Sequence, residues 1–110
     1  MNESVDTDTL SMLKEVMEDD FQLLVSTFLD DAQLRIPQLF EEFNAGDGEM
    51  LRQTAHSLKG SSSNLGAVRL SELCFQVEHR AKENQLDGLE DVLYQVKAEF
   101  DQVRSILEGL

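Results

Sequence analysis

Residues 51–81 of this 110-residue chain read LRQTAHSLKGSSSNLGAVRLSELCFQVEHRA. On either side of Gly66 the small and apolar side chains recur every three or four residues, which places them on one face of an α-helix. The inward positions are Leu51, Ala55, Leu58, Ser62 and Leu65, then Leu70, Leu73, Cys74, Val77 and Ala81. Gly66 is placed to supply the left-handed residue that ends a helix. The stretch predicts two antiparallel helices, the second running from about Val68 to Asn84.

The same period extends toward the N-terminus. A short helix is expected from about Thr9 to Met17, capped by Asp8 or Thr9. Its expected inner face consists of Leu10, Leu13, Val16 and Met17. Residues 1–7 precede this pattern, and we expect them to form a flexible arm.

A second amphipathic pattern begins near Asp19 or Asp20, either of which can cap a helix, and extends to Phe43. Pro37 falls inside this pattern, so we expect a kink or a break between two helices there. Residues 44–48, NAGDG, form the clearest turn in the sequence, and Asp47 is a plausible cap for the helix that follows.

The last helix repeats the same spacing after a turn at residues 85–88. Its inward positions are Leu89, Leu93, Val96, Phe100, Val103 and Leu107. Four long amphipathic helices with short connections predict an all-α fold: an antiparallel up-down four-helix bundle with an additional short N-terminal helix. A chain of this length has room for one core, so residues 1–110 are expected to form a single domain.

The composition is strongly acidic, since 22 Asp and Glu against 9 Lys and Arg give a formal net charge of −13. Such a chain repels phosphates and anionic lipids, so we expect no binding to nucleic acid or to a membrane. The single cysteine, Cys74, has apolar neighbours, which favours a buried thiol in a reducing compartment. There is no signal-peptide pattern and no apolar run long enough for a bilayer, so we expect a cytoplasmic protein, most simply a monomer.

One face of the helix around His56 has an unusual composition. Arg52, Lys59, Gly60 and Ser63 lie at helical spacing from the histidine and share its face. An imidazole flanked by two cations, a glycine and a hydroxyl would not be selected to stabilise a bundle core. This face is therefore the candidate functional site.

The charge pattern supports the same face. From Met50 to Ser71 the chain has no Asp or Glu, although it contains Arg52, Lys59 and Arg69. The gap predicts a local positive field on an otherwise negative molecule. Such a field suits a phosphoryl group or the acidic pocket of a partner.

Gly60 lies inside a strong helical pattern, where glycine costs about 1 kcal/mol relative to alanine. One reason to retain it is close approach of a partner to His56. The alternative is that the small residues 60–63 let another helix of the same chain pack closely. The sequence leaves both explanations open.

Helix rise suggests a residue that supports His56. If the chain folds back at Gly66, residue n lies level with about residue 134 − n on the next helix, which pairs His56 with Glu78. The Glu78 carboxylate can accept a hydrogen bond from Nδ1–H, which leaves Nε2 unprotonated and facing outward. Lys82, one turn further, adds a cation at the rim. A neutral imidazole nitrogen flanked by cations is what phosphoryl transfer requires.

The run HSLKGSSSNLGA over residues 56–67, with LSELCFQVE over residues 70–78, resembles the signature of histidine-containing phosphotransfer (Hpt) domains of bacterial and fungal phosphorelays. The resemblance covers almost the whole chain. It implies that His56 is the phospho-acceptor, that Lys59 contacts the phosphoryl group, and that Glu78 orients the imidazole. It also implies that Gly60 permits close docking. Lys82 stands where many members have arginine, so the charge is kept without the forked geometry.

The resemblance also implies the partners. These are receiver domains of hybrid sensor kinases and response regulators, which carry a phospho-acceptor aspartate and bring their own Mg²⁺. Arg52, Ser63 and Lys82 are further docking candidates, together with Phe75, for which a peripheral core position is an equal alternative. His79 is interpreted as a solvent-facing residue.

The expected function is a carrier without kinase activity of its own, because the sequence has no Gly-rich nucleotide motif. We expect no cofactor and no metal site, since no His or Cys pair has ligand spacing. The alternative is a phosphorylation-independent helical docking module for receiver domains. The intact set of His56, Lys59 and Gly60 favours the carrier.

Overall fold

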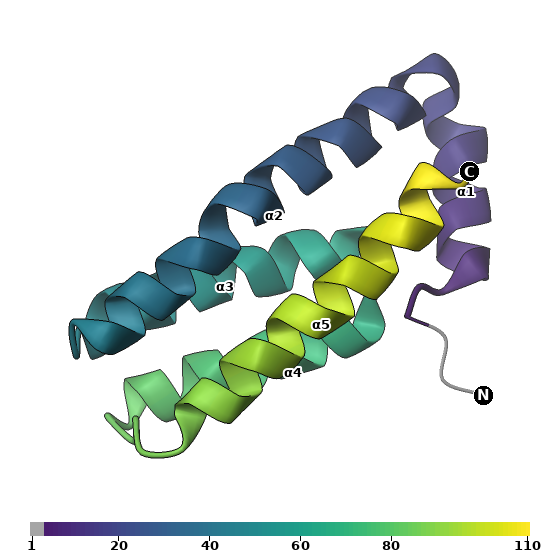
Figure 1. Cartoon of the computed structure of the whole chain (residues 1–110). Helices are drawn as coiled ribbons and strands as arrows, with labels where there is room; N and C mark the ends of the chain where they lie inside the picture. Colours follow the sequence, from purple (N-terminus) through teal and green to yellow (C-terminus); the bar gives the residue numbers. More distant parts are fainter. Residues whose placement is uncertain (1–3) are drawn as a thin grey trace.

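Helices are the only regular elements over residues 4–110, the part of the chain that a computed structural model describes (Figure 1). Their bounds are α1 Thr7–Met17, a 3₁₀ turn at Glu18–Asp20, α2 Phe21–Asn44, α3 Gly48–Asn64, α4 Val68–Lys82 and α5 Leu89–Glu108. No helix in this part of the chain is long and apolar enough to cross a lipid bilayer.

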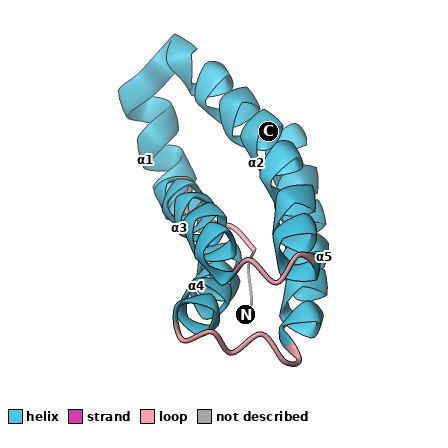
Figure 2. Cartoon of the chain, turned by 90° about the vertical axis from the view of Figure 1, so that its left-hand side faces the viewer, coloured by secondary structure: helices cyan, strands magenta, loops and turns pink. Residues whose placement is uncertain are grey.

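The four long helices form a closed ring. Each packs against its neighbours in sequence, and α5 returns to pack against α2. The short helix α1 lies across the end of the bundle that contains the α3–α4 turn and the C-terminus, opposite the α4–α5 connection (Figures 1 and 2). This arrangement confirms the antiparallel four-helix bundle with an additional N-terminal helix.

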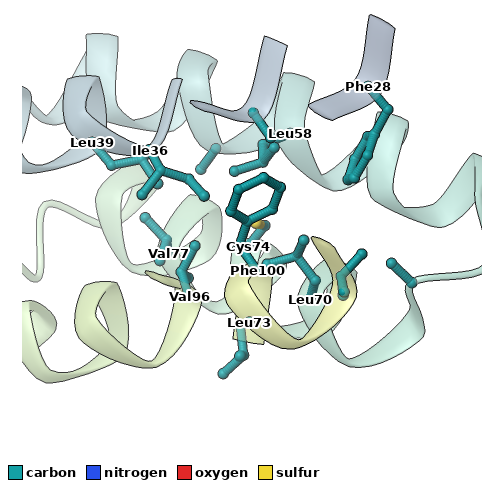
Figure 3. Close-up of a cluster of buried hydrophobic side chains, with 14 of the residues drawn as sticks. Phe28, Ile36, Leu39, Leu58, Leu70, Leu73, Cys74, Val77, Val96 and Phe100 are labelled. Carbon is teal, nitrogen blue, oxygen red and sulfur yellow. The ribbon is translucent and has the colours of Figure 1, made fainter. Parts of the chain in front are cut away.

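The core is built from the positions that the helical spacing selects. Every inward residue predicted on α3, α4 and α5 is buried. Figure 3 shows apolar side chains of all four long helices meeting between the helices. The ring centroids of Phe28 and Phe100 are 6.2 Å apart. Cys74 is buried in this cluster, as predicted.

Two helix boundaries that follow from turn chemistry are confirmed. The side chain of Asp47 caps α3 by accepting a hydrogen bond of 3.1 Å from the Met50 N–H. Gly66 has a φ of +76°, the left-handed conformation that ends α3. A Cβ on Gly66 would also lie 2.9 Å from the Thr9 Cβ, so two independent constraints require glycine there.

The N-terminal segment is more ordered than expected. Val5 is only 1% exposed, and the Asp6 N–H donates to the Gly66 carbonyl over 2.8 Å. Asp6 also caps α1, so this helix begins at Thr7 rather than Thr9. The flexible arm predicted over residues 1–7 is therefore wrong from Val5 onward, because the burial of Val5 anchors this segment to the bundle. Residues 1–3 lie outside the described part of the chain.

Two expectations for the first two helices are also wrong. Val16 does not face inward, since it is 79% exposed. Asp20 precedes α2 without a side-chain capping bond, because residues 18–20 form a 3₁₀ turn that leads into the helix. Of the kink or break expected at Pro37, the structure excludes the break. The α2 helix continues through Pro37, which lies on the exposed face, where water can satisfy the carbonyl that proline leaves without a donor.

Candidate functional site

His56 and Glu78 face each other across the α3–α4 interface. The Nδ1 atom of His56 lies 2.8 Å from Oε2 of Glu78, so the predicted pairing has the expected geometry. Because a carboxylate only accepts hydrogen bonds, Nδ1 carries the hydrogen, and Nε2 of a neutral ring is left with a free lone pair. The imidazole side chain is 61% exposed and the Glu78 side chain only 16%. An imidazole held by a carboxylate therefore projects from the surface of the bundle.

Lys59 uses the other oxygen of the same carboxylate. Its Nζ atom lies 2.9 Å from Oε1 of Glu78, and its side chain is 28% exposed. Burial alone would raise the pKa of Glu78, but the hydrogen bonds from Lys59 and His56 outweigh it and lower that pKa below its ordinary value. Glu78 therefore stays ionised and links the cation to the imidazole.

The predicted positive field is largely compensated. Arg52 pairs with Glu49 through contacts of 2.5 and 3.2 Å, and these bonds lower the pKa of Glu49 to about 2. Arg69 lies 3.6 Å from Glu99, which is only 8% exposed. The acids come from outside the acid-free stretch, so residues 50–71 do not form an uncompensated positive patch. Over residues 4–110, Lys82 has no ion pair.

The structure decides between the two explanations for Gly60. A Cβ placed there would meet no atom of residues 4–110 within 4 Å, so Gly60 does not serve packing within this part of the chain. The close-packing alternative is therefore wrong at this position. Ser63 is exposed one turn further along α3. With only small side chains at these two positions, the surface beside His56 is open to an approaching molecule.

Phe75 makes a contact that the sequence analysis did not identify. Its ring is 53% exposed, and the Lys59 ammonium lies 5.4 Å from the ring centroid. The ring of His79, itself exposed as predicted, lies 6.1 Å away at an interplanar angle of 26°. The signal was present, because the relation that pairs residue 56 with residue 78 also pairs residue 59 with residue 75.

Comparison with known proteins places this arrangement in a family. Residues 23–106 match the sequence model of the Hpt domain. The chain belongs to the Hpt domain family.

The Hpt domain resembles both solved structures and curated proteins. The crystal structure of histidine-containing phosphotransfer protein B from Pseudomonas aeruginosa PAO1 superposes with a TM-score of 0.95 at 38% identity, covering 99% of this chain and 95% of that chain. Histidine-containing phosphotransfer protein 1 of Oryza sativa subsp. japonica is 28% identical over 104 residues, 92% of this chain and 71% of the relative. Phosphorelay protein LuxU of Vibrio harveyi is 31% identical over 88 residues, 74% of this chain and 77% of the relative.

The candidate site of this Hpt domain lies on the exposed surface of the bundle, where 61% of the His56 side chain is accessible. A hollow of about 630 Å³ lies at the α4–α5 connection, and its lining includes neither His56 nor Glu78. Among residues 4–110, no group of three or more His, Cys, Asp or Glu side chains is placed to hold a metal ion. Burial raises the pKa of Cys74 to about 12, so its thiol stays protonated and unreactive. The exposed imidazole is suited to a macromolecular partner.

Proposed function

We propose that this Hpt domain is a phosphorelay carrier in which His56 accepts a phosphoryl group from the aspartate of one receiver domain and passes it to the aspartate of another. The observation that carries the proposal is the contact between Nδ1 of His56 and Glu78. It fixes the tautomer that leaves Nε2 free on an exposed ring.

The transfer needs little from the carrier beyond positioning. The Nε2 lone pair attacks phosphorus, the bond between phosphorus and the aspartate oxygen breaks, and the carboxylate leaves with the bonding electrons. The ring, which keeps its Nδ1 hydrogen, becomes cationic, and the Glu78 carboxylate offsets that charge. Lys59, at 2.9 Å from the same carboxylate, is close enough to turn toward the phosphoryl oxygens. Onward transfer is the reverse reaction with a second aspartate.

The docking surface is proposed to surround His56. Gly60 and Ser63 are small, exposed residues of α3 that leave space for a partner, and Phe75 provides an exposed apolar contact on α4. Arg52 and Lys82 add cations at the rim that suit the acidic end of a receiver. The partners are receiver domains of hybrid sensor kinases and response regulators. The Mg²⁺ that neutralises the aspartyl phosphate comes with the receiver, and the carrier has neither a cofactor nor kinase activity of its own.

The size and charge of the domain bear on its location and its oligomeric state. We propose that the domain acts as a cytoplasmic monomer, because a net charge of −13 opposes self-association. A carrier that must visit two receivers in turn benefits from being small and diffusible. The mass in solution, measured by light scattering, is expected to be that of one chain of 12.4 kDa.

Transfer from a phosphorylated receiver tests the function. Isolated receiver domains would be phosphorylated on aspartate with Mg²⁺, freed of donor, and mixed with this protein. We expect acid-labile phosphate to move to the wild-type chain and to a His79→Ala control, and not to His56→Ala. Addition of a second unphosphorylated receiver should then discharge the carrier. Stable binding to receivers with no transfer would favour the phosphorylation-independent docking module instead.

A further inference from the structure

We propose that Phe75 is a positioning residue for phosphoryl transfer, with its ring holding the Lys59 ammonium beside His56. The inference rests on the proposed carrier function and assigns to Phe75 a role that docking alone does not supply. The inference is drawn from the contacts that α4 makes with Lys59 of α3.

Three residues of α4 contact Lys59. The Ser71 hydroxyl donates to the Lys59 carbonyl over 3.1 Å, the Phe75 ring centroid lies 5.4 Å from Nζ, and Glu78 Oε1 lies 2.9 Å from Nζ. Positions 71, 75 and 78 follow the spacing of four and three that forms one stripe on a helix. One stripe of α4 therefore fixes the backbone of Lys59 and the end of its flexible side chain.

The ring is itself held in place. A half-exposed phenylalanine has rotational freedom, but the His79 ring lies one helical turn further along α4 and is stacked on it at 26°. Phe75 therefore presents a defined surface to Lys59.

The consequence concerns the moment when Lys59 must leave Glu78 for the phosphoryl group. A lysine held only by the carboxylate would be released into water once that ion pair opens. An ammonium that also lies over an aromatic ring is kept near His56, with a gain at exposed sites of about two- to fivefold in occupancy. Phe75 should therefore affect phosphorylation of His56 even when no receiver is present.

The contact can be tested without any phosphoryl chemistry. In the NMR spectrum, the methylene protons next to Nζ of Lys59 should show an upfield ring-current shift that disappears in Phe75→Leu and persists in Phe75→Tyr. If these protons resonate at the same positions in wild type and Phe75→Leu, the proposal is overturned. This readout separates failure of the contact from failure of the carrier function.

Its effect on reactivity is measured with phosphoramidate, a small donor that modifies histidine. We expect Phe75→Leu to slow labelling of His56 by about two- to fivefold and Phe75→Tyr to retain the wild-type rate. In a Lys59→Ala background, Phe75→Leu should have no further effect. Val68→Ala is the matched control, because Val68 is 49% exposed on the same helix, two turns away.

Three results would contradict the proposal. Phe75→Leu labelling at the wild-type rate while losing transfer from receivers would make Phe75 a docking residue only. Equal slowing with and without Lys59 would show that the ring acts by another route. If Val68→Ala slows labelling as much as Phe75→Leu does, the slowing results from loss of exposed apolar surface in general and not from the contact with Lys59. Thermal unfolding of each variant shows that it is folded at the assay temperature.

Discussion

Glu78 illustrates how one carboxylate can organise a surface site. Its two oxygens bind different partners on α3, with Nδ1 of His56 at 2.8 Å and Nζ of Lys59 at 2.9 Å. The same group therefore fixes the histidine tautomer and holds a cation beside the imidazole, and in the proposed transfer it would offset the charge that forms on the ring. Because Glu78 is largely buried, its ionisation depends on these partners, which links the site to stability.

That link predicts a pH dependence for Glu78→Gln. The pKa of Glu78 is lowered in the folded protein, so its stabilising contribution is present above the ordinary value of 4.5 and is lost as the pH falls through the folded-state pKa. At neutral pH we expect Glu78→Gln to reduce the free energy of unfolding by about 1 kcal/mol. Urea denaturation of both proteins across the acidic range should show this difference shrinking below pH 4.5. A difference that stays constant with pH would mean that ionised Glu78 does not contribute to stability.

The α3 helix shows a conflict between stability and function. Gly60 lies in its interior, where the backbone is helical and an added Cβ would meet nothing within 4 Å. No packing constraint from the described residues requires glycine, so the helix forgoes stability at this position. The open surface at Gly60 lies beside His56, so approach of a partner to the histidine is a reason to retain glycine at this position.

We therefore predict opposite effects of Gly60→Ala on stability and on transfer. The substitution should raise the free energy of unfolding by about 0.5–1 kcal/mol, because alanine is the better helix former. It should slow transfer from a phosphorylated receiver but not labelling by phosphoramidate, which is too small to meet the added methyl group. Gly66→Ala is the contrasting control and should destabilise, since Gly66 has a φ of +76° and lies against Thr9. If Gly60→Ala is destabilising, or if transfer from the receiver is unchanged, Gly60 is not retained for the approach of a partner at the expense of helix stability.

The bundle as a whole serves as a rigid support for the exposed imidazole of His56. The four long helices pack around one apolar core, and α1 covers the end near the α3–α4 turn (Figures 1 and 3). His56 lies on the outside of this support rather than in a cleft, so its selectivity must come largely from the surface that a partner meets. That design suits a protein that has to present the same group to more than one partner.

The sequence predicts most of this architecture, because helical spacing determines which side chains are buried. The relation between positions across the α3–α4 turn also identifies the pair of His56 and Glu78. It could not reveal that Glu49 and Glu99 neutralise nearby arginines, since the reach of long side chains is not encoded in periodicity. The burial of Val5 could not be predicted either, because a single apolar residue in a polar segment forms no periodic pattern that would indicate where it packs.

Phosphoramidate labelling of the intact protein shows whether His56 is a reactive nucleophile that Glu78 supports. His79 provides the internal control, because it is also exposed but its ring stacks on Phe75 and has no carboxylate partner within residues 4–110. We predict that, with Mg²⁺ at neutral pH, the mass increases by one phosphoryl group. Peptide mapping should place it on His56, the label should be labile in acid and stable in base, and His56→Ala should abolish it. If His56 stays unmodified, or reacts no faster than His79, the contact with Glu78 does not activate the imidazole and His56 is not the reactive group proposed.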